Sequence, residues 1–401
     1  MSRTLPPQDW MMAGETRAVM TALEAAGGPG CARFVGGCIR NALMEKPVDD
    51  VDIATTLHPD AVIAALTAAG LKSVPTGLDH GTVTAIAAGK PFEVTTLRRD
   101  VTTDGRNATV AFTDDWAEDA ERRDFRFNAL YADLEGQVFD PVGEGVADAL
   151  AGRVVFVGDP ETRIREDYLR ILRFFRFFAW YGRGEPDAAA LAACATLKDG
   201  MERLSAERIS KELLKLLDAA DPRPAVALMA QSGVLEQVAP LAQDLARLDA
   251  LVAQEGSDGL LRLAALLPDD GNAARVIAEN LRLSGAQRAR LIAALSPGTP
   301  LSATMSDVEA RRMLYDIGPQ TFADRLRLSG RVSPRLLTLA AAWKKPVLPA
   351  GGEDVAALGV PKGPMVGEVL RQVEAWWREN DFPLERRKVL KRLTEVVGKR
   401  A

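Results

Sequence analysis

Two short segments near the N-terminus constrain this chain more than any other part of its sequence. Residues 34–41 carry the pair Gly36-Gly37, and shortly afterwards Asp50 and Asp52 stand two positions apart. Glycines let backbone N–H groups approach a phosphate, and side chains two apart on a strand point to one face. Two carboxylates on one face can share divalent metal. Together the two segments predict nucleotidyl transfer.

Length and composition predict a multidomain protein without a membrane segment. The chain has 401 residues, of which 47% are hydrophobic and 26% are charged. A single core rarely grows beyond about 250–300 residues, so we expect at least two domains. No apolar run approaches the ~20 residues that cross a bilayer, and the first residues lack the apolar core of a signal peptide. We therefore expect no membrane contact and a cytoplasmic location.

Carboxylates and arginines are the residues available for catalysis. The chain has only two histidines, which leaves almost no material for a histidine-rich metal site or a Ser-His-Asp triad. Its three cysteines have neither disulfide nor zinc spacing, so we expect reduced thiols. The net charge of -5 argues against indiscriminate coating of nucleic acid but allows a local basic surface.

The sequence pattern changes near residue 155. The first part alternates helix-like and strand-like segments, with helices at 16–26, 40–45 and 59–69 and strands at 31–35, 50–55, 82–88 and 92–97. Beyond about Ile164 apolar residues recur at helical spacing, with no convincing strand. The predicted fold class is α+β, an α/β head on a helical remainder. We expect a catalytic head at 1–155, a helical neck at 156–220, a helical body at 221–345 and a helical tail at 346–401.

Asp50 and Asp52 are the candidate catalytic and metal-binding residues. Carboxylates at alternate strand positions can hold two Mg²⁺ ions roughly 3.5–4 Å apart, one activating an attacking hydroxyl and one steadying the leaving pyrophosphate. Glu93, on a strand that could neighbour the first, is the candidate third ligand. An Asp-x-Asp pair alone more often marks an exposed strand, so the prediction depends on the preceding glycine pair.

Two arginine-rich segments supply candidate nucleotide contacts. In residues 121–130, Arg123 could bind triphosphate oxygens, and the alternative is a helix-end network of ion pairs. Residues 163–177 are predicted to form a helix with one charged face and one apolar face. The charged face comprises Arg163, Glu166, Asp167, Arg170, Arg173 and Arg176. It could bind a base and phosphates, but an ordinary i,i+3 ion pair between Asp167 and Arg170 is the alternative.

These segments resemble the motifs of class II tRNA nucleotidyltransferases and bacterial poly(A) polymerases, a branch of the polymerase-β-like nucleotidyltransferases. The family patterns GGxVRD, DxDIAT, RRDFTxNA and EDxxRxLRxxRF are matched in that order between residues 36 and 177. The chain departs from them where Asn41 replaces the usual Asp, where Arg126-Phe127 replaces Thr-Ile, and in a loop at 104–108 that follows the family only in part.

The resemblance implies a role for each matched position. Asp50 and Asp52 would bind the catalytic Mg²⁺. Asp167 and Arg170 would read the Watson–Crick edge of CTP or ATP. The remaining nucleotide contacts would come from Gly37, Arg40, Arg123, Arg173 and Arg176.

The family resemblance also suggests which member this chain is. Residues 80–84 are similar to a segment of CCA-adding members, and a loop at 98–112 is of the kind that accompanies their switch from C to A addition. We therefore expect an enzyme that adds or repairs the 3′-terminal CCA of tRNA from CTP and ATP, with the helical body and tail contacting the tRNA. The alternatives are a poly(A) polymerase and, more remotely, a non-catalytic RNA-binding protein.

Overall fold

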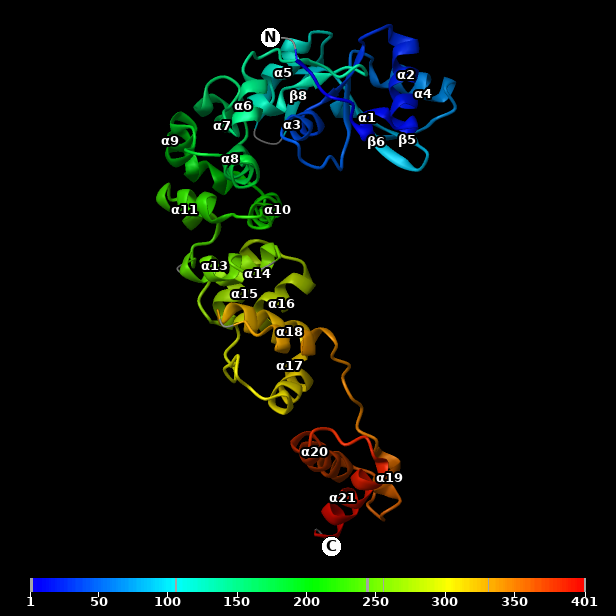
Figure 1. Ribbon diagram of the computed structural model, residues 1–401, viewed down its shortest axis with the longest axis vertical. Helices are drawn as coiled ribbons and strands as arrows, with labels where there is room; N and C mark the ends of the chain where they lie inside the picture. The colour runs from blue at the N-terminus through cyan, green and yellow to red at the C-terminus, as the bar shows by residue number, and fades with distance from the viewer. Residues whose placement is uncertain (1–2, 105–106, 243–244, 255, 331, 400–401) are drawn as a thin grey trace. The chain divides into compact units, whose positions relative to one another are not determined.

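The computed structural model describes residues 3–104, 107–242, 245–254, 256–330 and 332–399 (Figure 1). It divides into two units. The first consists of residues 1–242 with 256–259, and the second of residues 243–255 with 260–401. None of the described helices is long and apolar enough to span a membrane.

A mixed sheet of eight strands organises the N-terminal part of the first unit. Its order is β1-β10-β9-β2-β3-β6-β5-β4, and β3 and β6 form its parallel pair. The strands are β1 (Arg3–Thr4), β2 (Ala32–Val35), β3 (Asp52–Thr55), β4 (Lys72–Gly77), β5 (Thr82–Ala87), β6 (Lys90–Thr96), β9 (Tyr131–Ala132) and β10 (Gln137–Phe139). A separate hairpin joins β7 (Arg98–Asp104) to β8 (Asn107–Phe112).

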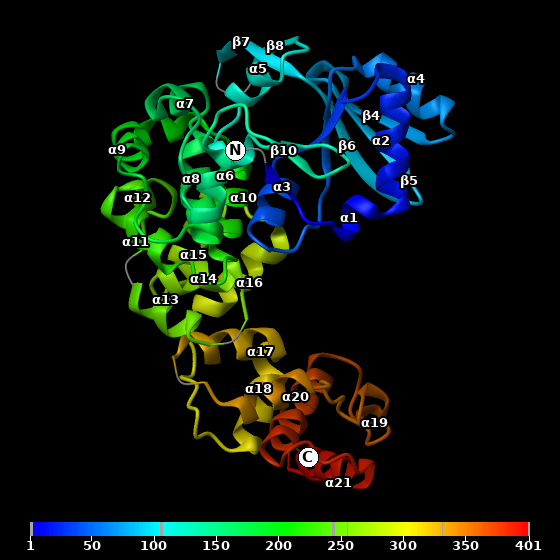
Figure 2. The same cartoon turned by 45° about the horizontal axis from the view of Figure 1, so that its top comes forward.

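Period-2 burial explains the best predicted strands. Val83, Ala85 and Ala87 of β5 are buried and alternate with more exposed neighbours, as expected for a strand with one face in the core. Helices α2 (Gly14–Gly27) and α4 (Pro59–Ala68) pack against each other and against strands of this sheet (Figure 2). The strands predicted at 31–35, 82–88 and 92–97 are present. The segment 98–112 was expected to be a loop, but its described residues form a hairpin. Residues 105–106 of this segment lie outside the described part.

Helices form the rest of the first unit. The remaining α-helices of this unit are α1 (Asp9–Met12), α3 (Gly37–Leu43), α5 (Trp116–Glu121), α6 (Gly145–Ala151), α7 (Pro160–Glu166), α8 (Leu169–Tyr181), α9 (Ala188–Leu197), α10 (Ala206–Leu217), α11 (Arg223–Gln231) and α12 (Val234–Val238). Three short 3₁₀ turns lie at Leu78–His80, Arg126–Asn128 and Lys198–Arg203. Helices α8 and α10 pack together through buried apolar side chains such as Phe174 and Leu213.

The helix predicted over 163–177 is wrong in one respect, because the chain breaks between α7 and α8. Asp167 has an extended backbone with φ -153° and ψ 105°, so the charged residues on either side belong to two different helices. No proline or glycine marks this break. The polar contacts of Asp167, described below, are the compensating interactions.

The described part of the second unit is entirely helical, which with the head confirms the predicted α+β class. Its helices are α13 (Leu245–Val252), α14 (Gly259–Leu266), α15 (Gly271–Asn280), α16 (Gly285–Leu295), α17 (Asp307–Leu328), α18 (Pro334–Ala341), α19 (Gly352–Ala356), α20 (Pro364–Glu379) and α21 (Arg386–Gly398). Helix α17 is kinked where Gly318, with φ 77° and ψ 162°, precedes Pro319.

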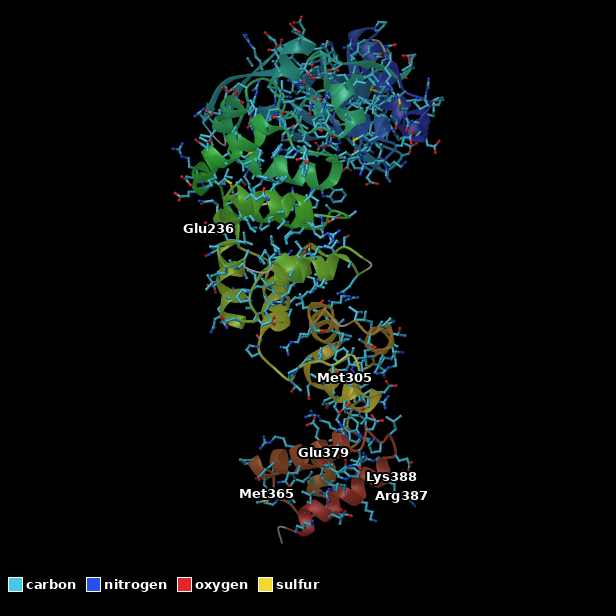
Figure 3. All side chains as sticks on the ribbon, turned by 60° about the vertical axis from the view of Figure 1, so that its left-hand side comes forward. Glu236, Met305, Met365, Glu379, Arg387 and Lys388 are labelled. Atoms are coloured by element: carbon cyan, nitrogen blue, oxygen red, sulfur yellow. The ribbon has the colours of Figure 1, made fainter. Side chains whose placement is uncertain are left out.

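Basic side chains such as Arg387 and Lys388 lie on the last helix, α21 (Figure 3). Arg387 and Lys388 are exposed near the start of α21. Several of its cations have acidic partners, since Arg386 pairs with Asp354 at 2.5 Å and Lys388 with Glu385 at 2.9 Å. The contact of this tail with tRNA, and the four-part division predicted from the sequence, stay predictions.

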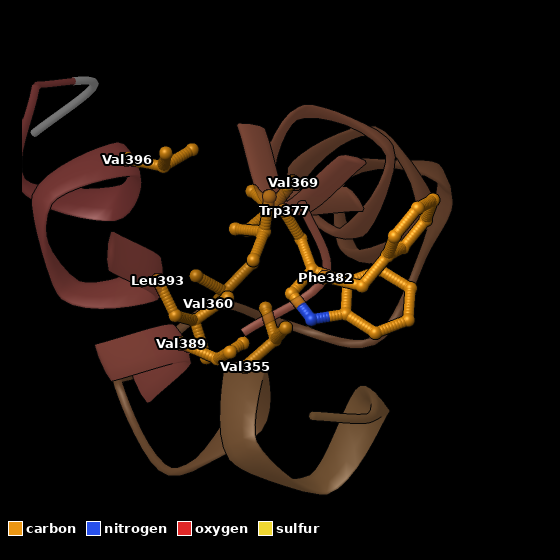
Figure 4. Packing of buried hydrophobic residues seen from close by; sticks show 9 residues of the cluster. Val355, Val360, Val369, Trp377, Phe382, Val389, Leu393 and Val396 are labelled. Carbon is orange, nitrogen blue, oxygen red and sulfur yellow. The ribbon is translucent and has the colours of Figure 1, made fainter. Parts of the chain in front are cut away.

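A compact apolar cluster holds α19, α20 and α21 together (Figure 4). Trp377 is fully buried at its centre, with its ring 5.0 Å from that of Phe382, and its indole N–H donates to the Pro383 carbonyl at 2.9 Å. The other members are Val355, Val360, Val369, Val373, Val389, Leu393 and Val396. A buried indole with a satisfied N–H makes this position central to the stability of the tail.

Replacing Trp377 with alanine should lower the free energy of unfolding of the second unit by about 3–5 kcal/mol, because a large cavity forms. Equilibrium urea unfolding of the full chain measures this. The control is Leu384→Ala, whose side chain is 79% exposed and whose removal should change the free energy by less than about 0.5 kcal/mol. Equal effects of the two substitutions would contradict the assigned core.

Candidate active site

A cavity of about 780 Å³ in the first unit brings most of the predicted site residues together. Its lining combines the β2–α3 turn, the segment before β3, and side chains of α8. The predicted residues in the lining are Gly37, Arg40, Asp50, Asp52, Arg123, Asp167, Arg170, Arg173 and Arg176. Arginines outnumber carboxylates there, so the cavity suits an anionic ligand.

The glycine pair forms the turn between β2 and α3. Gly36 has φ 73°, a conformation that side chains rarely adopt, and a Cβ atom there would lie 3.4 Å from the Asn128 carbonyl oxygen. No described side chain caps the first turn of α3. The turn therefore leaves backbone N–H groups at a helix start available to a phosphate.

The two aspartates lie at the edge of this cavity. Asp52 is the first residue of β3, whereas Asp50 is exposed in the segment before it, so the strand begins two residues later than predicted. Burial and the neighbouring charge of Glu93 raise the pKa of Asp52 to about 6. Neither aspartate forms an ion pair with a described residue.

Glu93 lies beside Asp52 but outside the cavity lining. The two residues are partners in the parallel register of β3 and β6, and Glu93 is exposed. Within the described residues, no group of three or more His, Cys, Asp or Glu side chains is placed to hold a metal ion. The assignment of Glu93 as a third metal ligand stays a prediction.

Arg40 is buried against aromatic rings and contacts only neutral groups among its described partners. Its guanidinium carbon lies 4.0 Å from the ring centroid of Tyr181, and it donates to the Tyr181 hydroxyl at 2.8 Å. It also donates to the side-chain oxygens of Asn41, at 2.9 Å, and Asn128. Asn41, at the departure from the family pattern, donates in turn to the Pro47 carbonyl at 2.7 Å. An amide at position 41 therefore links Arg40 to the segment that carries Asp50.

Arg123 takes part in the ion-pair network that was the alternative to nucleotide binding. Arg122 and Arg123 both pair with Asp119, at 2.6 and 2.9 Å, and the Tyr131 hydroxyl donates to the same carboxylate at 2.7 Å. Burial acts to raise the pKa of Asp119, but the two arginines and this hydroxyl hold it below its usual range. Since Arg123 also lines the cavity, the network holds a guanidinium group at the cavity wall.

Asp167 and Arg170 make separate contacts, with no ion pair between them. Arg208 of α10 donates to Asp167 Oδ2 at 2.7 Å, and the Leu169 N–H donates to Oδ1 at 3.1 Å. Arg170 pairs with Glu166 and donates to the Arg163 carbonyl at 2.8 Å. The i,i+3 ion-pair alternative is therefore not what the structure contains, and both side chains line the cavity.

Arg173 and Arg176 are held by buried carboxylates. Arg173 pairs with Asp124 at 2.5 Å, and Arg176 pairs with Glu212 at 2.5 Å. Asn128 donates to Asp124 at 3.1 Å and accepts from Arg40, which joins the arginines of α3 and α8 in one network. Asp124 and Asn128 lie inside the 121–130 motif and could have been named from it. No local pattern indicates a role for Glu212, Arg208 or Tyr181.

Two family models match segments of this chain. A model described as the poly A polymerase head domain matches residues 32–155. One described as a probable RNA and SrmB-binding site of polymerase A matches residues 185–245.

Curated relatives match almost the whole chain. The mitochondrial CCA tRNA nucleotidyltransferase 1 of Mus musculus is 33% identical over 380 residues, which cover 89% of this chain and 85% of that protein. The chain belongs to the family of CCA-adding enzymes and poly(A) polymerases. Another member, the CCA-adding enzyme of Levilactobacillus brevis, is 30% identical over 92% of this chain and 93% of its own.

Solved structures of the family have the same fold. The Bacillus stearothermophilus CCA-adding enzyme, determined in complex with CTP, matches with a TM-score of 0.75 at 25% identity and covers 97% of this chain and 99% of its own. The Thermotoga maritima CCA-adding enzyme, complexed with tRNA, matches with a TM-score of 0.68 at 16% identity and covers the full length of both chains. Membership in this family makes the protein a nucleotidyltransferase with a polymerase-β-like head.

Replacing Asp52 with asparagine should stabilise the folded protein at pH 8 by roughly 2–4 °C. A pKa raised to about 6 means that the folded state disfavours the ionised form, which predominates at pH 8. The gain should shrink as the pH falls through 6 and vanish near pH 4, where the folded protein holds Asp52 protonated. Thermal unfolding of metal-free protein across this pH range measures the gain.

The control for this experiment is Asp49→Asn, because Asp49 is exposed on the same segment. It should change the melting temperature at pH 8 by less than about 1 °C, as expected for an exposed substitution. A destabilised Asp52→Asn variant at pH 8, or a gain independent of pH, would show that the environment of Asp52 is not as described.

Proposed function

We propose that this protein adds or repairs the 3′-terminal CCA of tRNA from CTP and ATP, releasing pyrophosphate at each addition. The observation that carries the proposal is the meeting, in one cavity, of the Asp50 and Asp52 carboxylates with the arginines of α3 and α8 and the Asp167–Arg170 segment. The names of the curated relatives, their coverage of about nine tenths of the chain, and the CTP and tRNA complexes of structural neighbours support it.

Asp50 and Asp52 would bind magnesium. Mg²⁺ prefers hard oxygen ligands and commonly uses one or two carboxylates together with substrate phosphates and water. The two aspartates fit this donor set, since neither forms an ion pair with a described residue, and burial together with Glu93 raises the pKa of Asp52 although the charge of Arg123 acts to lower it. Bound there, Mg²⁺ would assist ionisation of the primer 3′-hydroxyl and neutralise charge on the leaving pyrophosphate.

The arginines and the glycine turn would bind the triphosphate. Arg40, Arg123, Arg173 and Arg176 line the cavity, as does Gly37 in the turn. Hydrogen-bond and ion-pair partners within the protein hold these guanidinium groups in place. The guanidinium groups are therefore oriented before a nucleotide binds. In the reaction the 3′-hydroxyl oxygen forms a bond to the α-phosphorus and the bond to pyrophosphate breaks. Positioning and charge stabilisation carry such a step without a covalent enzyme intermediate.

Asp167 and Arg170 would select the base. Cytosine and adenine both present an amino donor beside a ring-nitrogen acceptor, whereas uracil and guanine present a carbonyl acceptor beside an N–H donor. A carboxylate only accepts and a guanidinium only donates, so the pair complements C and A and repels U and G. This chemistry lets side chains replace a nucleic-acid template.

The helical second unit and the tail would contact the tRNA mainly through backbone and shape, because many different tRNAs must be accepted. The cytoplasmic location stays a prediction, since the curated relatives include mitochondrial enzymes. A role of the segment 98–112 in the switch from C to A addition stays a prediction, and residues 105–106 of this segment lie outside the described part.

Incubation with tRNA that lacks its last three nucleotides tests the function. With CTP and ATP, wild-type protein should extend the tRNA by CCA and stop, and Asp50→Ala or Asp52→Ala should reduce the rate by at least roughly 10³-fold while RNA binding persists. Product length and sequence are the measurements. Repeated A addition without use of CTP would instead identify a poly(A) polymerase, the activity named in the matched head model.

Arg170→Ala should weaken nucleotide discrimination more than it weakens metal binding. Removing a base-edge donor should lower the ratio of kcat/KM for CTP over UTP by about 5- to 100-fold, because the pair complements cytosine and rejects uracil. Steady-state incorporation with each nucleotide separately gives this ratio. Full retention of discrimination would contradict the assignment of this residue to base selection.

A further inference from the structure

We propose that Arg208 is a positioning residue that enforces base selection by fixing the Asp167 carboxylate, an inference that rests on the proposed function. Arg208 lies on α10, outside the segments that carry the family motifs. Its guanidinium donates to Asp167 Oδ2 at 2.7 Å across 41 residues of sequence. It is absent from the cavity lining, so it acts through Asp167 and not on the nucleotide directly.

The contacts of Asp167 explain why it needs such a partner. Asp167 stands in the break between α7 and α8, where its extended backbone leaves the helical hydrogen-bond pattern. Within the described residues, one carboxylate oxygen is held by the Leu169 N–H at 3.1 Å and the other by Arg208. The Leu169 N–H lies only two residues from Asp167, at the start of α8, so this contact is local in sequence. Arg208 is the contact that ties the carboxylate to a separate element.

Helix α10, which carries Arg208, is itself held in place by ion pairs and buried leucines. One turn after Arg208, the buried side chain of Glu212 pairs with Arg176 at 2.5 Å and approaches Arg173 at 3.7 Å. Side chains four apart lie on one helix face. The same face of α10 therefore presents a cation to the base-selecting aspartate and a carboxylate to the arginines proposed to bind phosphate. Buried leucines on α10, such as Leu213 and Leu216, anchor the helix in the core.

Arg208 holds the Asp167 carboxylate in the orientation proposed to discriminate between bases. A carboxylate accepts hydrogen bonds only, so in this orientation it accepts from an amino group and repels a carbonyl oxygen, whereas a carboxylate that is free to rotate can turn away from the base. Uracil and guanine present a carbonyl oxygen where cytosine and adenine present an amino group. Loss of Arg208 should therefore admit UTP and GTP, while triphosphate contacts stay in place. A purely structural role would instead lower the use of all four nucleotides equally.

The experiment compares Arg208→Ala, Arg208→Lys and the wild-type protein. It measures kcat/KM for CTP and for UTP on tRNA lacking its end, the dissociation constants of both nucleotides by calorimetry, and the melting temperature. In Arg208→Ala the preference for CTP over UTP should fall roughly 10-fold, both in the ratio of kcat/KM values and in the ratio of dissociation constants. The fall should be smaller in Arg208→Lys because a cation is retained. Lys211→Ala is the matched control, since it removes an exposed cation from the same helix and should leave both ratios unchanged.

A contrasting variant separates the two contacts of α10. Glu212→Gln should reduce binding of CTP and UTP by the same factor, because Glu212 orients arginines and not the base-selecting carboxylate. An unchanged CTP preference in Arg208→Ala, or an equal loss for both nucleotides, overturns the inference.

The proposed function can fail independently. If wild-type protein binds CTP in preference to UTP but extends no tRNA, CCA addition is wrong, and the calorimetric ratios still decide the role of Arg208. If wild-type protein binds neither nucleotide preferentially, both proposals are wrong.

Discussion

Pairing between buried carboxylates and arginines is the interaction on which the site depends. Asp119, Asp124 and Glu212 are all less than 10% exposed, and each is held by guanidinium groups. A buried carboxylate without such partners would be strongly destabilising, and so would a lone buried guanidinium. The pairs therefore hold the head and the following helices in one arrangement, and they fix the arginines whose remaining N–H groups face the cavity. The same arginines therefore stabilise the first unit and are available to bind an anion.

Asp50 and Asp52 follow the opposite rule. Neither forms an ion pair with a described residue, and burial beside Glu93 leaves Asp52 in an environment that disfavours its charge even though the charge of Arg123 acts in the opposite direction. Such incompletely compensated charge is typical of sites that gain a cation or a substrate during their work. The contrast between satisfied carboxylates around the cavity and unsatisfied ones at its edge separates the groups that support the site from those proposed to perform the chemistry.

Local pattern predicted the head and most of the proposed site residues. The glycine turn, β5 and β6 were each predicted from the pattern of a few neighbouring residues. Residues of the motif segments line the cavity. Strands β9 and β10, of two and three residues, are too short for any periodicity to indicate. The break at Asp167 was missed because one of the contacts that compensate for it, from Arg208, lies 41 residues away in sequence. Contacts of this kind depend on tertiary packing, which no local pattern contains.

The kink in α17 gives one helix two sets of neighbours. Before Gly318, Arg311 pairs with Asp381 at 2.7 Å and Tyr315 donates to Glu374 at 2.5 Å, both in the tail. After it, the fully buried Asp324 pairs with Arg290 of α16 at 2.8 Å. A shortened chain that ended before α19 would strip the first half of this helix of its polar partners and uncover the Tyr315 ring. Evolutionary loss of the tail would thus require compensating changes upstream, which makes the C-terminal helices an integral part of the second unit instead of a detachable appendage.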